Sequence, residues 1–209
     1  LDDISFSNQS PIVLIGGINV IEDFGFTYEV AKYYKDICKK LKIPLVFKAS
    51  YDKANRSSIS SYRGPGIEDG IKVFEKLKDM LDIKILTDVH SEEEALKIQK
   101  TVDIIQLPAF LARQTDLIGA IAKTNKLVNI KKPQFISPYQ TKNIIDKFKE
   151  FGNNKILLCE RGTCFGYDNL IVDMLGIGVI KKNCDNVPII FDVTHALQCR
   201  NSSDKASGG

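Results

Sequence analysis

The sequence predicts an α/β fold built on a parallel sheet, and more specifically a (β/α)8 barrel. Short apolar runs alternate with segments of helical periodicity throughout the 209 residues, which is the pattern of strands joined by helical crossovers. Each apolar run also leads into polar, mostly ionisable residues. Barrel enzymes draw their catalytic groups from the carboxyl ends of many strands, so this distribution favours a barrel.

The expected strands are seven runs rich in Val, Ile and Leu. They are continuous rather than alternating, as is typical of parallel strands covered on both faces. These runs are residues 12–17, 45–50, 83–89, 104–109, 127–132, 155–160 and 188–193.

The expected helices lie between the strands, where apolar residues recur at helical spacing. They cover residues 27–41, 68–81 and 92–100, a segment capped by Thr115 or Asp116, a segment from Gln140 to the stop at 152–154, and a shorter one at 168–175. Ser91 with Glu94 three residues later predicts a helix N-cap.

An open doubly wound sheet is the alternative architecture, in which ligands gather where the strand order reverses. The polar outlets of all seven runs favour the barrel instead. They hold Asn19, Lys48, Asp88 with His90, Gln106, Lys131 with Lys132, Glu160 with Arg161, and Asp192 with His195. Seven strands would leave two open edges. We therefore expect residues 1–209 to form a single barrel domain, C-terminally incomplete, with the eighth strand and last helices beyond Gly209.

The composition is ordinary for a globular protein, at 44% hydrophobic and 26% charged residues. The net charge of +3 is too small to suggest nucleic acid, and no apolar run approaches the ~20 residues that cross a bilayer. The five cysteines include no C-x-x-C pair, which suits free thiols in a reducing compartment. We expect a cytoplasmic protein with no nucleic-acid partner and no membrane partner.

The stretch 47–66 concentrates cations at the end of the second apolar run. Lys48, Lys53, Arg56 and Arg63 lie among hydroxyl and amide side chains, and Asp52 is the only acid from Lys48 to Arg63. Arg offers a planar fork of donors and Lys a point charge, so the stretch favours a site for phosphate or carboxylate oxygens over a solvated basic loop.

The predicted barrel mouth holds more cations than acids, which indicates an anionic substrate such as a phosphorylated metabolite. The cations are Lys48, Lys53, Arg56, Lys131 and Arg161, facing the acids Asp88, Glu160 and Asp192. Adjacent strand residues alternate faces, so either Lys131 or Lys132 could point inward. There is no G-x-x-x-x-G-K-[ST] loop and no G-x-G-x-x-G after the first strand, which argues against nucleotide chemistry.

The two histidines follow strand ends. For His90 a structural and a functional role are equally favoured. For His195, just after Asp192, a proton shuttle or phosphate contact is favoured. The spacing of His195 and Cys199 gives zinc only weak support, and Cys164 is interpreted as a small loop residue.

Long motifs then resemble one family over about residues 11–209. They are Lys53-Ala-Asn-Arg-Ser-Ser58, Tyr62-Arg-Gly-Pro-Gly66, Thr87-Asp-Val-His90, residues 106–116, Lys131-Lys-Pro-Gln-Phe135, Phe165-Gly-Tyr-Asp-Asn-Leu170 and residues 191–198. They resemble the 3-deoxy-D-manno-octulosonate 8-phosphate synthases. The sister synthases of 3-deoxy-arabino-heptulosonate phosphate carry Lys-Pro-Arg-Thr in place of residues 53–56 and match less well.

The resemblance implies a condensation of phosphoenolpyruvate with D-arabinose 5-phosphate in lipopolysaccharide Kdo biosynthesis. Phosphoenolpyruvate would contact Lys48, Lys53, Gln106, Lys131, Arg161 and His195. The sugar phosphate would contact Asn55, Arg56, Ser57, Asp88 and, from a neighbour in a homotetramer, Arg113. The implied catalytic residues are Lys53, as proton donor, with His195, Asn19 and Asp88.

Metal dependence separates two branches of that family. One branch binds a divalent metal through a Cys on the first strand's loop, the His equivalent to His195, and two acids near the C-terminus. Asn19 stands at the Cys position, and an amide is a far weaker soft-metal ligand than a thiolate, so we expect no metal and no cofactor. A truncated, inactive relic that only binds sugar phosphates is the alternative to an enzyme.

Overall fold

The computed structural model describes residues 1, 3–167 and 169–198. Seven parallel strands form one sheet in the order β1-β2-β3-β4-β5-β6-β9. Their bounds are β1 Leu14–Gly17, β2 Leu45–Lys48, β3 Lys84–Asp88, β4 Ile104–Leu107, β5 Leu127–Lys131, β6 Ile156–Glu160 and β9 Ile189–Phe191. All seven predicted strands are present, each shortened by one or two residues at one or both ends.

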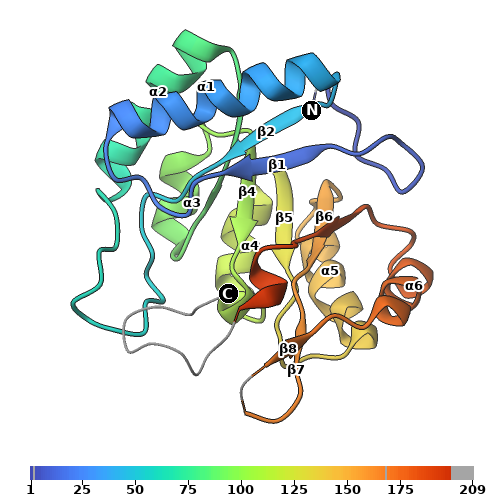
Figure 1. The fold of residues 1–209 in the computed structure, drawn as a ribbon. Coiled ribbons are helices and arrows are strands. Elements are labelled where there is room, and N and C mark those ends of the chain that lie inside the picture. The colour runs from blue at the N-terminus through green and yellow to red at the C-terminus, as the bar shows by residue number, and fades with distance from the viewer. Residues whose placement is uncertain (2, 168, 199–209) are drawn as a thin grey trace.

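The strand order confirms the barrel architecture. Each strand of the large sheet lies beside the preceding strand of that sheet, and the sheet curls into a half-barrel (Figure 1). An open doubly wound sheet requires a reversal of strand order. The sheet runs through its seven strands without one, so that alternative is wrong.

Six α-helices connect the strands of the half-barrel and pack around its outside (Figure 1), five of them in the segments where the sequence predicts a helix. Right-handed crossovers between sequential parallel strands place every helix on the same side of the sheet. The bounds are α1 Phe24–Leu41, α2 Ile67–Leu81, α3 Glu92–Ile98, α4 Thr115–Lys123, α5 Thr141–Glu150 and α6 Met174–Asn183. Three short 3-10 turns accompany them, η1 Ala109–Leu111, η2 Pro138–Gln140 and η3 His195–Leu197.

Side-chain caps define several helix starts. The Asp23 carboxylate accepts from the Phe26 amide at 2.8 Å, and α1 follows. The predicted cap at Ser91 is confirmed, because its Oγ accepts from the Glu94 amide at 3.2 Å. The predicted cap at Thr115 or Asp116 is wrong. Helix α4 begins after Gln114, whose side chain makes no capping hydrogen bond.

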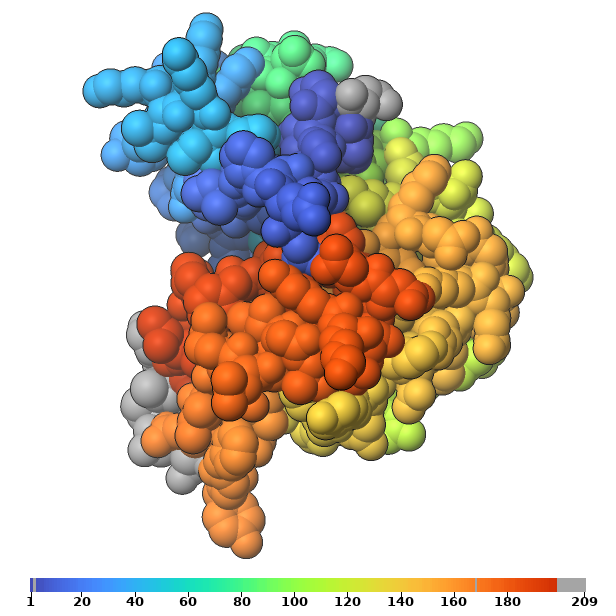
Figure 2. Space-filling model, turned by 90° about the vertical axis from the view of Figure 1, so that its right-hand side faces the viewer, coloured from blue at the N-terminus to red at the C-terminus, as the bar shows by residue number. Residues whose placement is uncertain are grey.

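The predicted helix at 168–175 is also wrong. Two short strands, β7 (Thr163–Cys164) and β8 (Leu170–Ile171), pair there as an antiparallel hairpin. Helix α6 begins later, where the Asp173 carboxylate accepts from the Leu175 amide at 3.0 Å. Asp168 lies outside the described residues. Figures 1 and 2 both show the hairpin projecting from the body of the molecule.

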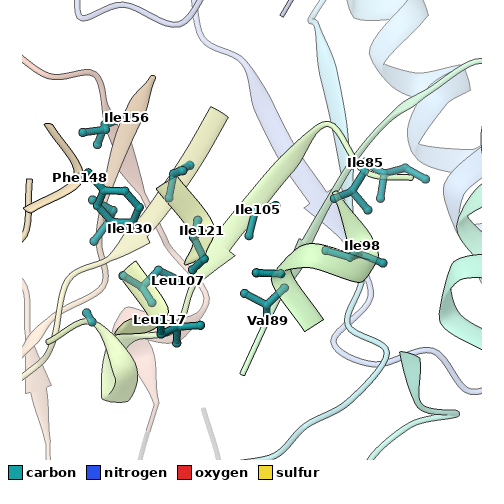
Figure 3. Close-up of a cluster of buried hydrophobic side chains, with 14 of the residues drawn as sticks. Ile85, Val89, Ile98, Ile105, Leu107, Leu117, Ile121, Ile130, Phe148 and Ile156 are labelled. Carbon is teal, nitrogen blue, oxygen red and sulfur yellow. The ribbon is translucent and has the colours of Figure 1, made fainter. Parts of the chain in front are cut away.

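The two faces of the sheet bury separate apolar clusters. The larger cluster lies between the sheet and the helices, where strand residues such as Ile85 and Ile105 meet Ile98 and Ile121 (Figure 3). The smaller cluster lies on the inner face. It contains Val46, Leu86, Ile104 and Leu157 from four strands, covered by Ile4 of the N-terminal segment. That segment therefore closes the amino end of the half-barrel and leaves the carboxyl end for the site.

The half-barrel has two edges within the described residues. Strand β1 hydrogen-bonds to β2, and strand β9 to β6, with no further sheet partner for either in this part of the chain. The eighth strand, expected to follow Gly209 and to lie between these edges, stays a prediction. So does the assignment of residues 1–209 to one C-terminally incomplete domain.

Candidate active site

The inner face of the sheet changes from apolar to polar toward the carboxyl ends of the strands. Val46, Leu86 and Ile104 belong to the inner apolar cluster. Because side chains on a strand point inward at every second residue, the next inward positions lie two residues further along. On six strands these are Lys48, Asp88, Gln106, Asn129, Cys159 and Asp192. A polar layer therefore sits on the apolar floor.

Asp88 lies at the centre of the first cluster in this layer. Its carboxylate is 3.9 Å from the ammonium nitrogen of Lys48 and 3.9 Å from that of Lys53. The Ser50 hydroxyl donates to Asp88 and accepts from Lys48 at 3.0 Å and from Lys53 at 2.8 Å. One carboxylate and one hydroxyl thus hold two ammonium groups beside each other.

This crowding changes the protonation of both charge types. Burial, together with the charge of Lys53, lowers the pKa of Lys48 to about 7, despite the opposing attraction of Asp88. Burial alone would raise the pKa of Asp88. The charges of Lys53, Lys48 and His90 outweigh it and hold the pKa of Asp88 well below its usual range. Asp88 is therefore ionised, and Lys48 titrates near neutral pH.

His90 is held between two carboxylates. Its Nε2 is 3.3 Å from Asp88 and its Nδ1 is 3.2 Å from Glu94, which also accepts from the His90 amide at 2.6 Å. Tyr51 donates to the same Glu94 carboxylate at 2.8 Å. Burial opposes the charged ring, but the hydrogen bonds to Asp88 and Glu94 raise the pKa of His90 to about 9. Protonated His90 orients Asp88 and adds to the local positive charge.

Lys131, Asp192 and His195 form the second cluster. The Lys131 ammonium forms a close ion pair with the Asp192 carboxylate. Asp192 also accepts from the His195 amide at 2.9 Å and lies 2.8 Å from His195 Nδ1. The contact with Asp192 favours the charged ring, but burial and the charges of Lys131 and Lys48 outweigh it and lower the pKa of His195.

The two clusters face the same space. The charge of Lys131 contributes to the lowered pKa of Lys48, and the charge of Lys48 contributes to that of His195. Arg161 is 4% exposed and donates to the Gln198 side chain, just after the His195 turn, at 2.6 Å. The strand outlets therefore gather positive charge in one place, as the sequence predicts.

The structure settles which neighbouring lysine faces the mouth. Lys131 lies on the inner face with Asn129, whereas Lys132 is fully buried on the other side, 3.5 Å from Glu160. The expected place of Glu160 among the acids of the mouth is therefore wrong. Glu160 lies two residues after Leu158, which packs in the larger cluster between the sheet and the helices. Alternate residues of a strand point to the same face, so Glu160 also points toward the helices.

Gln106 extends the polar layer across the middle of the sheet. It is 8% exposed, and its side-chain oxygen accepts from Asn129 Nδ2 at 3.1 Å. An amide pair offers donors and acceptors without adding charge. Gln106 thus lies between the Asp88 cluster on β3 and Lys131 on β5.

The loop after Lys53 forms the rim of the site. Asn55 and Ser57 are exposed and Arg56 is partly buried, with Arg56 Nε donating to the Tyr62 carbonyl at 3.2 Å. Arg63 is instead paired with Asp52, its Nε donating at 2.8 Å. The expected contribution of Arg63 to the cation cluster is therefore wrong, because the nearest carboxylate holds it.

Two predicted residues lie away from the buried clusters. Asn19 is exposed just after β1, and Arg113 is exposed in the turn before α4. The Arg113 carbonyl accepts from Lys147 at 3.1 Å. The structure thus brings together Lys48, Lys53, Asp88, Lys131 and His195, with Gln106 and Arg161 adjoining them.

Comparison with known proteins identifies the family. A family model described as the DAHP synthetase I family matches residues 2–207. This chain belongs to the DAHP synthetase I family. Among its relatives, the protein of Parasynechococcus marenigrum (strain WH8102) is 62% identical over all 209 residues, which cover 74% of that protein. The protein of Prochlorococcus marinus (strain MIT 9313) is 62% identical, and that of Cronobacter sakazakii (strain ATCC BAA-894) is 59% identical, with the same coverage. All three are named 2-dehydro-3-deoxyphosphooctonate aldolase.

Sequence reasoning missed two polar side chains of these buried clusters. Ser50 is fully buried at the centre of the Asp88 cluster, and Glu94 holds His90 from helix α3. A signal existed for both. Ser50 lies two residues after Lys48 in the predicted strand 45–50, where alternate residues share a face. Glu94 lies in the first turn of a helix that begins just after His90.

Within residues 1, 3–167 and 169–198, no group of three or more His, Cys, Asp or Glu side chains is arranged to hold a metal ion. Cys199, the possible partner of His195, lies outside these ranges. No helix within them is long and apolar enough to cross a bilayer. Metal independence stays a prediction.

Proposed function

We propose that this chain condenses phosphoenolpyruvate with D-arabinose 5-phosphate and water to give 3-deoxy-D-manno-octulosonate 8-phosphate and phosphate. It would thereby act as a transferase in Kdo and lipopolysaccharide biosynthesis. Relatives 62% identical over the whole chain are named for the same product, as 2-dehydro-3-deoxyphosphooctonate aldolases. The observation that carries the proposal is the gathering of Lys48, Lys53 and Lys131 around two carboxylates at the carboxyl ends of the strands.

The charge of this site fits the two substrates. Together they bring two phosphates and one carboxylate, and preorganised cations in a buried site stabilise such groups better than water does. We assign the phosphoenolpyruvate contacts to Lys48, Lys53, Gln106, Lys131, Arg161 and His195. We assign the sugar-phosphate contacts to Asn55, Arg56, Ser57, Asp88 and Arg113.

The chemistry requires one proton donor for the sugar aldehyde. The enol carbon of phosphoenolpyruvate forms a bond to the aldehyde carbon, and the aldehyde oxygen takes up a proton. Water adds to the neighbouring carbon, and the bond from that carbon to the phosphate oxygen breaks. We assign the proton donor to Lys53, which belongs to the Asp88 cluster and immediately precedes the rim residues Asn55, Arg56 and Ser57.

His195 has properties suited to proton handling near the phosphate. Asp192 accepts from its backbone amide at 2.9 Å and lies 2.8 Å from its ring Nδ1, so the ring is held beside that carboxylate. Its lowered pKa keeps the ring largely neutral at neutral pH, and a neutral imidazole can accept a proton from one partner. We place it beside the phosphate and the water that attacks.

Asn19 supports a reaction that needs no metal. A divalent metal held through this loop would require a strong ligand, and a neutral amide replaces the thiolate there. We propose that the enzyme works without metal or cofactor, with Asn19 contributing an amide hydrogen bond. Activity should survive dialysis against a chelator. A stoichiometric metal after gentle purification, with activity lost to chelator and restored by that metal, would overturn the proposal.

We further propose a homotetramer in which Arg113 completes a neighbour's sugar-phosphate site. The exposure of Arg113 before α4, outside the buried clusters, supports this. We place the enzyme in the cytoplasm, which the free thiols of Cys38, Cys159, Cys164 and Cys184 support.

Phosphate release measured with each substrate separately and together tests the proposed function. Release should require both phosphoenolpyruvate and arabinose 5-phosphate. The variant Lys72→Met removes a lysine from an exposed ion pair with Asp69 and should leave the rate unchanged. Faster release with erythrose 4-phosphate would indicate the sister synthase activity. Binding of sugar phosphate without release would indicate an inactive relic.

A further inference from the structure

Lys132 is a fully buried charge that the proposed reaction does not use. Its side chain has no exposed surface, and it extends away from the mouth. The ammonium donates to the Thr163 hydroxyl at 2.9 Å and to the Gly162 carbonyl at 3.2 Å. A lysine is rarely buried without partners, and both of these partners lie just after the end of β6.

Glu160 completes this contact from the end of β6. It is 2% exposed, and its Oε1 lies 3.5 Å from the Lys132 ammonium and accepts from the Gly162 amide at 2.6 Å. The Glu160 carboxylate thus holds the backbone amide of the residue that follows Arg161. Lys132 holds the carbonyl of the same residue, Gly162. Both peptide groups of Gly162 are fixed by one buried ion pair.

The turn that this pair holds tolerates little change. Gly162 has φ +95°, and an added Cβ would lie 3.0 Å from the Leu170 Cβ. The Lys132 amide donates to the Cys159 carbonyl at 2.9 Å, and the Cys164 amide donates to the Gln134 carbonyl at 2.9 Å. Two backbone hydrogen bonds therefore join the segments around the ends of β5 and β6, in addition to the ion pair.

Two proposed ligand-binding cations lie immediately beside the pair in sequence. Lys131 precedes Lys132, and Arg161 follows Glu160. Adjacent strand residues point to opposite faces. When one side chain is held on the helix side of the sheet, the backbone there is held as well. The direction in which the neighbouring side chain leaves the backbone, toward the mouth, is then also fixed.

We propose that the buried Lys132–Glu160 pair is a positioning device that holds Lys131 and Arg161 at the spacing needed to bind phosphoenolpyruvate. This inference rests on the proposed function. Neither residue touches substrate. The pair acts through the backbone, and it selects for the enolpyruvate anion over the sugar phosphate, whose proposed contacts lie on the loop after Lys53.

Steady-state kinetics of Lys132→Met, Glu160→Gln and the surface control Lys72→Met tests the proposal. Displacing a binding group by a fraction of an ångström weakens binding steeply, so Lys132→Met should raise KM for phosphoenolpyruvate about tenfold or more. KM for arabinose 5-phosphate should stay within about twofold, since its contacts are not held by the pair. Glu160→Gln keeps an acceptor for the Gly162 amide and should give a smaller increase.

A purely structural role predicts a different result. It would lower the melting temperature and the fraction of active enzyme, with both KM values unchanged, and that outcome overturns the proposal. Equal increases in the two KM values overturn it as well. If Lys132→Met does not fold, Glu160→Gln and Thr163→Val carry the same test, because each removes one interaction of the ammonium.

Binding measurements separate this inference from the proposed function. If the wild type does not turn over the two substrates, the proposed function fails. The positioning claim is then tested by calorimetric binding of phosphoenolpyruvate alone. Weaker binding in Glu160→Gln than in Lys72→Met supports it. Equal binding in both, or no binding by the wild type, overturns it.

Discussion

Replacing Asp88 by Asn removes the carboxylate that holds two ammonium groups in the mouth of the half-barrel. Each nitrogen, of Lys48 and of Lys53, lies 3.9 Å from it. At an effective dielectric constant of about 20, a pair at that distance attracts by about 4 kcal/mol. That attraction corresponds to about three pKa units. Water entry and side-chain movement reduce it, so we expect the pKa of Lys48 to fall at least about one unit below its present value of about 7.

The pH dependence of kcat/KM for phosphoenolpyruvate, at saturating sugar phosphate, measures this change. An anionic ligand binds better when Lys48 carries its proton. The wild-type profile should therefore decline above pH about 7, where Lys48 loses the proton. In Asp88→Asn the decline should begin at least about one unit lower. Lys48→Arg provides the assignment control, because a guanidinium keeps its charge and the decline should disappear.

An unchanged alkaline limb in Asp88→Asn would refute this reasoning. Asp88 would then not be what keeps Lys48 charged. A limb that persists in Lys48→Arg would refute the assignment of the titration to Lys48. Saturating sugar phosphate matters, because Asp88 is also a proposed sugar contact, and its replacement should raise KM for that substrate as well.

Three further predictions follow from the same contacts. Lys53→Ala should lower turnover about a hundredfold or more if Lys53 is the proton donor, and near-normal turnover would remove it from that role. The pKa of His90 is raised from about 6.5 unfolded to about 9 folded. Its stabilising effect is therefore full below pH about 6.5 and is lost as the pH rises through about 9, up to about 3 kcal/mol. Urea unfolding of His90→Gln and wild type should accordingly differ more at pH 6 than at pH 9.5, and an equal difference would contradict the ion pairs. Binding of phosphoenolpyruvate near pH 8 should take up protons, because the ligand's charge favours protonated Lys48. Calorimetry in two buffers of different ionisation enthalpy measures that uptake, and heats that do not depend on the buffer would contradict it.

The fold was predictable because its signals are local and repeated. Continuous apolar runs located all seven strands, and helical spacing located the helices between them. The segment 168–175 failed because two short elements share it. The apolar residues of the hairpin strand β8 are followed closely by those of α6. Together they imitate the spacing of a single helix, which matches neither element.

The sequence predicts which residues lie at the ends of the strands, but not which hydrogen bonds and ion pairs they form. The end of a parallel strand marks where Lys48, Asp88 and Lys131 must meet. Their hydrogen bonds depend on distances between strands that the sequence does not contain. Arg63 shows this limit, because a nearby Asp52 holds it on the surface. Glu160 shows it as well, since one residue of register separates the mouth from the opposite face.

The distribution of charge in this half-barrel explains why its mouth suits binding better than stability. Burial, together with the charges of Lys53 and Lys131, lowers the pKa of Lys48 despite the neighbouring Asp88. A carboxylate added at the centre would reduce the repulsion among the lysines and would also fill the space that an anion needs.

On the opposite face of the sheet the arrangement is the reverse. Lys132 and Glu160 are matched one to one and fully enclosed, so their charges are neutralised within the protein. In the mouth, three lysines share the two carboxylates of Asp88 and Asp192, and a phosphorylated ligand can supply the missing negative charge. The matched pair lies where rigidity is needed to keep those cations in place.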